Sequence, residues 1–286
     1  MPAPVDKKGV QRLLGTMNYI AKFVHYMSTI TEPIRQLLKN ETHFIWIYEQ
    51  KAAFERIKEI LTKDPVLTYF DVTKPVPVSC DASKSGLGAM LLQDEKPIAF
   101  ASRSMTETET RYANSEKELL AILFGLERFH QYTYRKHVFV ESDHKPLEAI
   151  VKKPLANTPP RLQRMLLILQ TYDFSVNYRP GKLLVVSDML SRAYIKDNRD
   201  NMNDDIECFI NMVINSMLVS DKKLEEIKVE TEKDDKLSIV RQFIREGWPE
   251  NKHDLPNKIY EYWNCKYELT ESKGVVLKGE KIVIPT

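Results

Sequence analysis

VSCDASKSGLGAML, residues 78–91, carries an acid between an apolar run and two glycines. Asp81 stands directly after the first of three short extended runs, which are PVPVSC (75–80), GAMLLQ (88–93) and PIAFAS (97–102). Short apolar runs bounded by turn residues predict a three-strand meander. Gly86 and Gly88 have no Cβ, so they allow a sharp turn or a close approach of the backbone to a ligand beside Asp81. The stretch therefore predicts a functional acid at a strand end.

Helical and extended patterns alternate after the meander. They are NSEKELLAILFGLERFHQY (114–132, helical), HVFVESD (137–143, extended), a leucine-rich helical stretch over 160–172, DFSVNY (173–178, extended) and LLVVSDMLSR (183–192, helical). In DFSVNY, apolar and polar residues alternate strictly, as in a half-buried strand. This order predicts an α/β domain with a mixed five-stranded sheet and helices over residues 73–194.

The flanks of this domain have a different character. Residues 8–62 show apolar residues at helical spacing and predict a small all-helical unit over 1–72. The polar stretch KDNRDNMNDD predicts a linker over 195–205. Residues 206–286 have weaker periodicity and end in GVVLKGEKIVIPT, where two valine-rich runs around a polar turn predict a hairpin. This tail is predicted to be α+β.

Composition places the chain among ordinary globular proteins, with 286 residues, 43% hydrophobic and 29% charged. The net charge is +2, and the first two thirds lean basic while the end leans acidic. That asymmetry fits a polyanionic partner and fits a solvated surface equally well. Cys80, Cys208 and Cys265 are too few and too scattered for a disulfide framework, so free thiols in a reducing intracellular compartment are expected. The most apolar run, 206–219, is interrupted by Glu207 and too short to cross a bilayer, so no membrane role is expected.

Four acids occupy informative places in the predicted α/β domain. Asp81 and Asp143 follow the first and fourth strands, Glu118 lies in the expected first turn of the first helix, and Asp188 lies on the closing helix. A helical crossover between the first and fourth strands would bring Asp81 and Asp143 side by side. Adjacent carboxylates repel unless a cation compensates them, and oxygen ligands suit Mg²⁺ or Mn²⁺. Two such ions about 4 Å apart would clamp the attacking water and the leaving oxygen of a phosphodiester.

Each acid also has a purely structural interpretation. The run Ser115 to Glu118 matches a capping box, in which Glu118 would satisfy a backbone N–H at the helix start. Asp81 and Asp143 could be turn residues, and Asp188 could be an exposed helix acid. Taken together, their order and context favour a metal-dependent phosphodiesterase site.

Several motifs resemble the RNase H part of the polyprotein of gypsy-type LTR retrotransposons. They are CDASKSGLGAML, IAFASRSM, ANSEKELLAIL, ESDHKPL and NYRPGKLLVVSDMLSR, and the resemblance of the chain to this family covers residues from about 5 to 194. It implies an RNase H-like fold and a metal-binding set of Asp81, Glu118, Asp143 and Asp188, with the second glutamate of EKE rather than Glu116. It also implies two Mg²⁺ ions, with Mn²⁺ as a substitute. The closing helix departs from the family, which more often has alanine at Ser187.

The N-terminal helices resemble the thumb or connection of a reverse transcriptase, on the motifs LLGTMNYIAKF and AAFERIKEILTKDPVLTYFD. This resemblance implies phosphate contacts from Lys7, Lys8, Arg12 and Lys22, although helix packing with solvated lysines is an equal alternative. The tail resembles the lead-in to an integrase. The Y-x-D-D motif of the polymerase palm is absent from the sequence, so no polymerase activity is expected of this chain alone. Tyr178 stands where cellular RNases H place a histidine, and it could equally be an ordinary strand aromatic.

The resulting hypothesis is an RNase H-type endoribonuclease that cuts the RNA strand of RNA/DNA hybrids. Its expected partners are such hybrids and the rest of the polyprotein, namely the palm and the integrase. Its expected location is a cytoplasmic particle or the nucleus. Two alternatives remain: an integrase or transposase core, whose acids run Asp, Asp, Glu along the chain, and a catalytically silent nucleic-acid-binding protein derived from such an element.

Overall fold

The computed structural model describes residues 3–20, 27–38, 44–61, 69–155, 158–194, 206, 221–249, 251–272, 274–279 and 281–285. The chain forms two compact units. The first contains residues 1–104, 124–143 and 172–197, and the second contains 105–123, 144–171 and 198–286. Helix α4 (Asn114–Arg128) is continuous across this division, so it belongs to both units.

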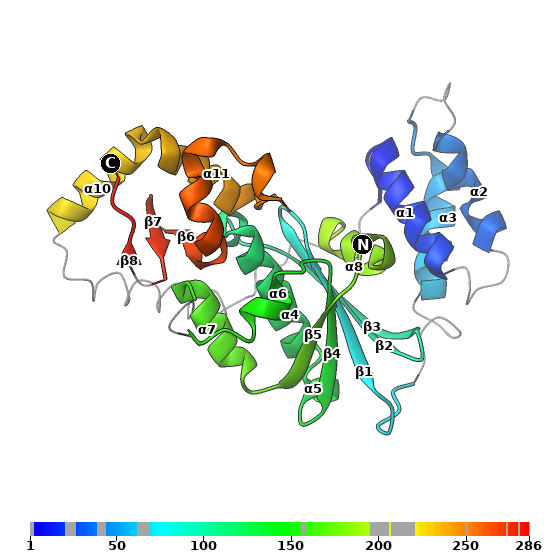
Figure 1. Ribbon diagram of the computed structural model, residues 1–286. Coiled ribbons are helices and arrows are strands. Elements are labelled where there is room, and N and C mark those ends of the chain that lie inside the picture. Colours follow the sequence, from blue (N-terminus) through cyan, green and yellow to red (C-terminus); the bar gives the residue numbers. More distant parts are fainter. Residues whose placement is uncertain are drawn as a thin grey trace. The chain divides into compact units, whose positions relative to one another are not determined.

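The first unit is built on a mixed five-stranded sheet in the order β3-β2-β1-β4-β5 (Figure 1). Its strands are β1 (Val76–Ala82), β2 (Gly86–Gln93), β3 (Lys96–Ser104), β4 (His137–Ser142) and β5 (Asp173–Tyr178). The meander pairs antiparallel, and β1, β4 and β5 pair parallel. The predicted mixed sheet is confirmed, and β5 has the predicted bounds.

Helices cover the two faces of this sheet at β1. Gly125 of α4 faces Val78 and Cys80, since a Cβ at Gly125 would lie 2.8 Å from the Cys80 sulfur. Ser79 instead hydrogen-bonds Ser187 of helix α8 (Val185–Arg192). Because successive strand residues point to opposite faces, α4 and α8 pack on opposite sides of β1. Strand β1 is thereby covered on both faces by helices that carry candidate acids.

The N-terminal helices pack around one apolar cluster. They are α1 (Lys7–Ile20), α2 (Met27–Arg35) and α3 (Tyr48–Leu61). Val10, Leu13 and Met17 recur at helical spacing on α1, and all three are buried in this cluster. Met189 of α8 joins the same cluster, so the predicted helical unit shares a core with the closing helix.

The second unit contains short helices and a three-stranded antiparallel sheet in the order β6-β7-β8. Its elements are η3 (Glu109–Arg111), α6 (Leu147–Ile150), α7 (Pro160–Leu169), α10 (Asp221–Lys233), α11 (Asp235–Glu246), η6 (Lys252–Asp254), η7 (Asn257–Glu268), β6 (Leu269–Ser272), β7 (Val275–Lys278) and β8 (Lys281–Ile282). The predicted C-terminal hairpin is confirmed by the β7–β8 pair, and β6 extends it.

Three helices have bounds that differ from the prediction, and one of them is the leucine-rich helix expected over 160–172, which is α7 and ends at Leu169. The helix expected over 114–132 ends at Arg128, because Phe129 leaves the helical conformation (φ −101°, ψ 21°) before the short α5 (His130–Thr133). The closing helix expected from Leu183 begins at Val185, after a 3-10 turn η5 (Gly181–Leu183).

Three smaller sequence expectations can be compared with the described residues. Cys80 and Cys265 are free thiols, as expected, and Cys208 lies outside the described residues. The apolar run 206–219 is described only at Ile206. No helix within the described ranges has the length and apolar character needed to cross a membrane.

Candidate functional site

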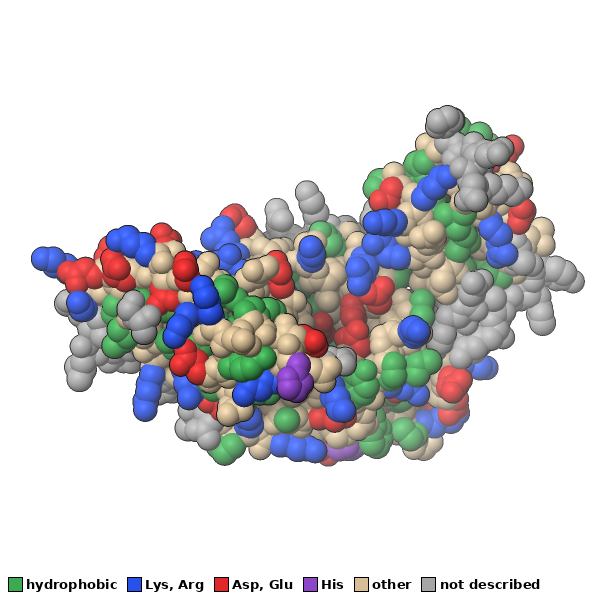
Figure 2. All heavy atoms as spheres, turned by 45° about the horizontal axis from the view of Figure 1, so that its top comes forward, with side chains coloured by type: hydrophobic (Ala, Val, Ile, Leu, Met, Phe, Trp, Pro, Cys, Tyr) green, Lys and Arg blue, Asp and Glu red, His purple; other side chains and the backbone are tan. Residues whose placement is uncertain are grey.

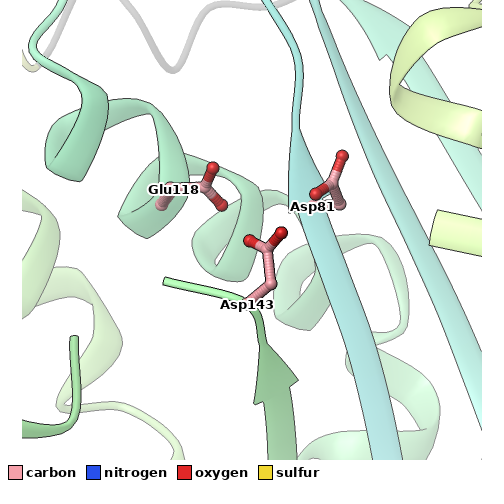
Figure 3. A group of neighbouring side chains, drawn as sticks. All are labelled: Asp81, Glu118 and Asp143. Carbon is pink, nitrogen blue, oxygen red and sulfur yellow. The ribbon is translucent and has the colours of Figure 1, made fainter. Parts of the chain in front are cut away.

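Three of the four predicted acids converge at one end of the sheet. Asp81, Glu118 and Asp143 each offer a carboxylate oxygen, and these oxygens lie within 4.8 Å of one another (Figure 3). The parallel register of Ser79 with Glu141 brings Asp81 and Asp143 to adjacent strand ends, as the predicted crossover requires. Figure 2 shows acidic side chains gathered near the middle of one face, with Lys and Arg side chains close by.

The start of α4 decides which glutamate joins this group. Glu116 lies in the first turn and accepts the Ala113 N–H at 2.9 Å through Oε2. Glu116, rather than Glu118, therefore makes the reciprocal contact of the capping box, which corrects both the predicted first-turn place of Glu118 and its capping alternative. Glu118 lies two residues further on, and its carboxyl faces Asp81 and Asp143 (Figure 3).

Asp81 is held in a buried position on β1. Its side chain is 5% exposed, and Oδ2 accepts a hydrogen bond from Ser191 Oγ at 2.6 Å. Burial raises the pKa of Asp81 to about 7, the Ser191 hydrogen bond opposes the rise, and the charges of Asp143 and Asp188 add to it. Protonation near neutral pH thus competes with any cation for this carboxylate.

Asp143 is exposed to solvent and lies against a glycine of the following turn. A Cβ at Gly181 would lie 2.8 Å from Asp143 Oδ2, so a larger residue there would push on the carboxylate. Packing around the group raises the pKa of Asp143, and the charge of Asp188 raises it further. Neither Asp81 nor Asp143 forms an ion pair with a basic side chain in the part of the chain that the structure describes.

Asp188 lies in the first turn of α8 and is paired with Arg192 on the same helix. Arg192 Nε and Nη2 donate to the same oxygen, Asp188 Oδ1, at 2.7 and 2.6 Å. This hydrogen bond raises the pKa of Arg192, and the charges of Asp81 and Asp143 contribute as well. Asp188 is outside the group of three converging acids, yet its charge reaches both Asp81 and Asp143.

The residues predicted to bind substrate have different surroundings. At Gly86 and Gly88, the space for a Cβ is filled by the backbone of α8, with Ser191 O at 2.2 Å and Ser187 O at 2.3 Å respectively. The two glycines therefore allow the backbone of β2 to approach the backbone of α8. Contact of either glycine with a ligand stays a prediction. Tyr178 ends β5 and is 41% exposed.

The predicted phosphate contacts lie on or near α1. Lys8 and Arg12 are exposed, Lys7 is half-buried, and Lys22 lies outside the described residues. Arg12 and Arg192 line one hollow of about 190 Å³ between α1 and α8. Asp6 also lines it, and Asp6 Oδ1 accepts the Gly9 N–H at 2.6 Å. That the basic residues on or near α1 contact substrate phosphates stays a prediction.

Three residues around the acids were not identified from the sequence. Ser191 contacts Asp81, Arg192 contacts Asp188, and Gly181 contacts Asp143. Ser191 and Arg192 belong to the same SDMLSR motif that supplied Asp188. The sequence predicted a metal-binding role only for the acid of that motif, so it gave no signal for the contacts of the other two.

The chain matches known proteins in sequence. Residues 71–172 match the model of the RNase H-like domain found in reverse transcriptase, a range that includes Asp81, Glu118 and Asp143. The Tf2-3 and Tf2-4 transposon polyproteins of Schizosaccharomyces pombe are each 32% identical to the chain over 241 residues, which is 82% of this chain. The chain spans 18% of the length of these polyproteins.

Solved structures share the fold. The foamy viral protease-reverse transcriptase in complex with double-stranded DNA superposes with a TM-score of 0.53 and 23% identity, covering 63% of this chain and 35% of that one. The native prototype foamy virus protease-reverse transcriptase gives a TM-score of 0.53 and 16% identity, covering 70% and 27%. The chain is therefore a homologue of retrotransposon polyproteins, and its residues 71–172 match the RNase H-like domain found in reverse transcriptase.

Proposed function

We propose that this chain is a divalent-metal-dependent endoribonuclease that cuts the RNA strand of an RNA/DNA hybrid. The observation that carries the proposal is the convergence of Asp81, Glu118 and Asp143, whose oxygens lie within 4.8 Å of one another. They come from β1, from α4 and from the turn after β4. The RNase H-like match at residues 71–172 supports the reaction class.

The carboxylates fit a divalent cation. Two unit charges this close repel by about 3–4 kcal/mol at an effective dielectric constant near 20. Burial raises the pKa values of Asp81 and Asp143, the charge of Asp188 raises both further, and the charge of Asp143 adds to the rise at Asp81. Hard oxygen ligands and a surplus of negative charge suit Mg²⁺, with Mn²⁺ as a substitute. We assign Asp81, Glu118 and Asp143 as the primary ligands and Asp188 as the fourth.

In this proposal the side chains have distinct tasks. Bound divalent ions supply the positive charge that activates the attacking water and stabilises the leaving oxygen. Ser191 fixes Oδ2 of Asp81, so Oδ1 is the oxygen proposed as the metal ligand. Arg192 contacts only Oδ1 of Asp188, so Oδ2 is the oxygen available as a ligand. Gly181 leaves the room in which the Asp143 carboxylate lies.

Recognition of the hybrid would depend on duplex shape and on 2′-hydroxyl groups rather than on base sequence. Lys7, Lys8 and Arg12 of α1 are proposed to contact backbone phosphates. The DNA-bound foamy viral enzyme shares the fold, which is compatible with a nucleic-acid duplex as the substrate class. The proposed partner is the rest of the polyprotein, with its palm and integrase. The proposed location is a cytoplasmic particle or the nucleus.

A labelled RNA/DNA hybrid incubated with Mg²⁺ and the purified chain tests the proposal. We expect cleavage of the RNA strand that stops in EDTA and in Asp81→Asn and Asp143→Asn variants. Glu141→Gln is a matched control, because Glu141 lies on β4 two residues before Asp143 and pairs with Arg179 instead. Cleavage at the full rate by Asp81→Asn would overturn the assignment.

One contact favours a second candidate function. The Asp188–Arg192 pair already neutralises the fourth acid, as expected of a catalytically silent nucleic-acid-binding protein. Calorimetric titration with Mg²⁺ separates the two. Hybrid binding without any metal affinity would favour the silent protein, and metal affinity lost in Asp143→Asn would favour the nuclease.

A further inference from the structure

A glutamate in the first turn of α4 is tied to the C-terminal sheet. Glu116 is 1% exposed and uses both carboxylate oxygens. Oε2 accepts the Ala113 N–H at 2.9 Å, and Oε1 accepts a hydrogen bond from Thr270 Oγ1 of β6 at 2.6 Å. One side chain thus joins the first turn of α4 to a strand that lies more than 150 residues later in the chain.

Arg161 of α7 contacts both Glu116 and Thr270, so a third element joins this group. Its Nη1 donates to the Glu271 carbonyl at 2.8 Å and lies 3.3 Å from Thr270 Oγ1 and 3.4 Å from Glu116 Oε2. The guanidinium also stacks over the Tyr112 ring, with its carbon 4.6 Å from the ring centre. Arg161 is 6% exposed, so its charge depends on these partners.

Apolar packing joins the same parts. Ala113, the residue before α4, is buried in one cluster with residues of the C-terminal lobe, which we define as the described residues from 221 to 285. The lobe's members of this cluster are Leu237, Val240, Ile244, Leu255, Ile259, Leu269 and Val276. The beginning of α4 is therefore part of the lobe's own core.

We infer that the C-terminal lobe positions the metal ligand Glu118, with Thr270 and Arg161 as positioning residues that act through Glu116. Glu118 follows Glu116 by two residues on one rigid helix, so a shift of the first turn moves its carboxylate relative to Asp81 and Asp143. The sequence alone predicts a domain that ends near 194. The contacts instead make the lobe a working part of the nuclease, an inference that rests on the proposed function.

Replacement of Thr270 in the full chain tests the inference. Thr270→Val keeps the shape and removes the hydroxyl that binds Glu116, and Thr270→Ser restores it. We expect faster hydrogen exchange of the amides at 114–118 in Thr270→Val, and Mn²⁺ affinity weaker by about tenfold or more. The turnover number should fall with little change in KM for the hybrid, and Thr270→Ser should recover all three properties.

Thr231→Val is the matched control. Thr231 is a fully buried threonine of the lobe whose hydroxyl donates only to Ile227 O within α10. The control should leave exchange at 114–118 and Mn²⁺ affinity unchanged. Wild-type exchange at 114–118 and wild-type Mn²⁺ affinity in Thr270→Val would overturn the inference.

Fluorescence of Trp248 and Trp263, which pack against the lobe's core, reports whether Thr270→Val keeps the lobe folded. If the lobe unfolds, the amides at 114–118 should lose protection together with it, and protection that persists beside an exchanging lobe would overturn the inference. The exchange measurement needs no metal. A wild-type chain that neither binds Mn²⁺ nor cleaves the hybrid therefore counts against the proposed function, while the exchange result still decides the positioning role.

Discussion

At Asp81, burial and neighbouring negative charge favour the protonated carboxyl, whereas the Ser191 hydrogen bond and, less strongly, the charge of Arg192 favour the charged form. The proposed nuclease needs the charged form of Asp81, so a bound cation would offset the cost of ionising this buried carboxyl. The protonation of Asp81 can therefore be measured through the pH dependence of the free energy of unfolding.

The folded-state pKa of Asp81, about 7, lies above the ordinary value of 3.8 for an aspartate side chain. The folded chain therefore binds this proton more tightly, so the stabilisation is complete below about pH 4 and is lost as the pH rises through 7. In EDTA, the wild-type free energy of unfolding should fall between pH 4 and 8 by on the order of a few kcal/mol, since one pKa unit corresponds to about 1.4 kcal/mol. Asp81→Asn should show a smaller fall, measured by urea unfolding. Equal pH dependence in the two proteins would contradict the burial of this carboxylate.

Ser191→Ala should weaken Mn²⁺ binding at pH 7. In the native chain the Ser191 hydroxyl lowers the pKa of Asp81, so its removal leaves more of this carboxyl protonated and unable to bind the cation. Hydrogen bonds to charged groups contribute about 1.5–3 kcal/mol. The deficit should shrink at pH 8.5, where a larger fraction of Asp81 is ionised in the variant than at pH 7. Calorimetry at the two pH values measures it.

Ser187→Ala is the control on the same helix. Ser187 is buried but pairs with Ser79 rather than with an acid. It should keep native Mn²⁺ affinity at both pH values. A deficit in Ser191→Ala that is the same at pH 7 and 8.5 would show that the hydroxyl does not act through the ionisation of Asp81.

At the scale of elements, the closing helix α8 approaches β2 closely enough for backbone to meet backbone. Gly86 and Gly88 make this possible, and Ser83 and Ser102 add hydroxyl bonds to the carbonyls of Ser191 and Leu190 at 2.7 and 2.6 Å. Because α8 carries Ser191 and Asp188, the way α8 packs on the sheet determines where these two side chains lie relative to Asp81 and Asp143.

Gly88→Ala should displace α8, since the new Cβ would lie 2.3 Å from the Ser187 carbonyl oxygen. We expect a loss of about 1–3 kcal/mol in the free energy of unfolding, as for overpacked interiors, together with weaker Mn²⁺ binding. Thermal unfolding and calorimetry measure the two effects.

Gly15→Ala on α1 is the control. Its Cβ would meet only Val185 Cγ1 at 3.8 Å, and alanine in place of a helical glycine stabilises by up to about 1 kcal/mol. If Gly88→Ala proved as stable as Gly15→Ala, the close packing of α8 against Gly88 would be contradicted.

At the scale of the molecule, the front of the chain leans basic and the acid group lies within it. Binding of a polyanion to such a surface depends on phosphate contacts and weakens with salt. Arg12 lines the hollow beside α8 and forms no ion pair within the described residues. It is therefore the best-placed of the predicted contacts on α1.

Arg12→Gln should weaken binding of the RNA/DNA hybrid and reduce the slope of log affinity against log salt by about 1. Fluorescence anisotropy at several salt concentrations measures the slope. Arg56→Gln is the control, because Arg56 is paired with Glu59 on the exposed side of α3. An unchanged slope in Arg12→Gln would remove this residue from the substrate path.

Much of the local structure could be predicted from the sequence. Alternation of apolar and polar residues gave β5 its bounds, and the strand-end places of Asp81 and Asp143 predicted their adjacency. Helix boundaries were less certain, since the end of α4 depends on a backbone change at the buried Phe129 that no turn residue marks. Glu116 and Glu118 are chemically identical, and only their partners distinguish them.

The sequence by itself determined the order of strands and helices and the set of candidate acids, because side-chain periodicity and residue type act locally. Only the tertiary structure decided that Ser191 holds Asp81, that α8 fills the space beside Gly86 and Gly88, and that Thr270 secures the start of α4. Ser191 and Asp81 are 110 positions apart, and Thr270 and Glu116 are 154 apart. Contacts of this range depend on how whole elements pack, which no local pattern encodes.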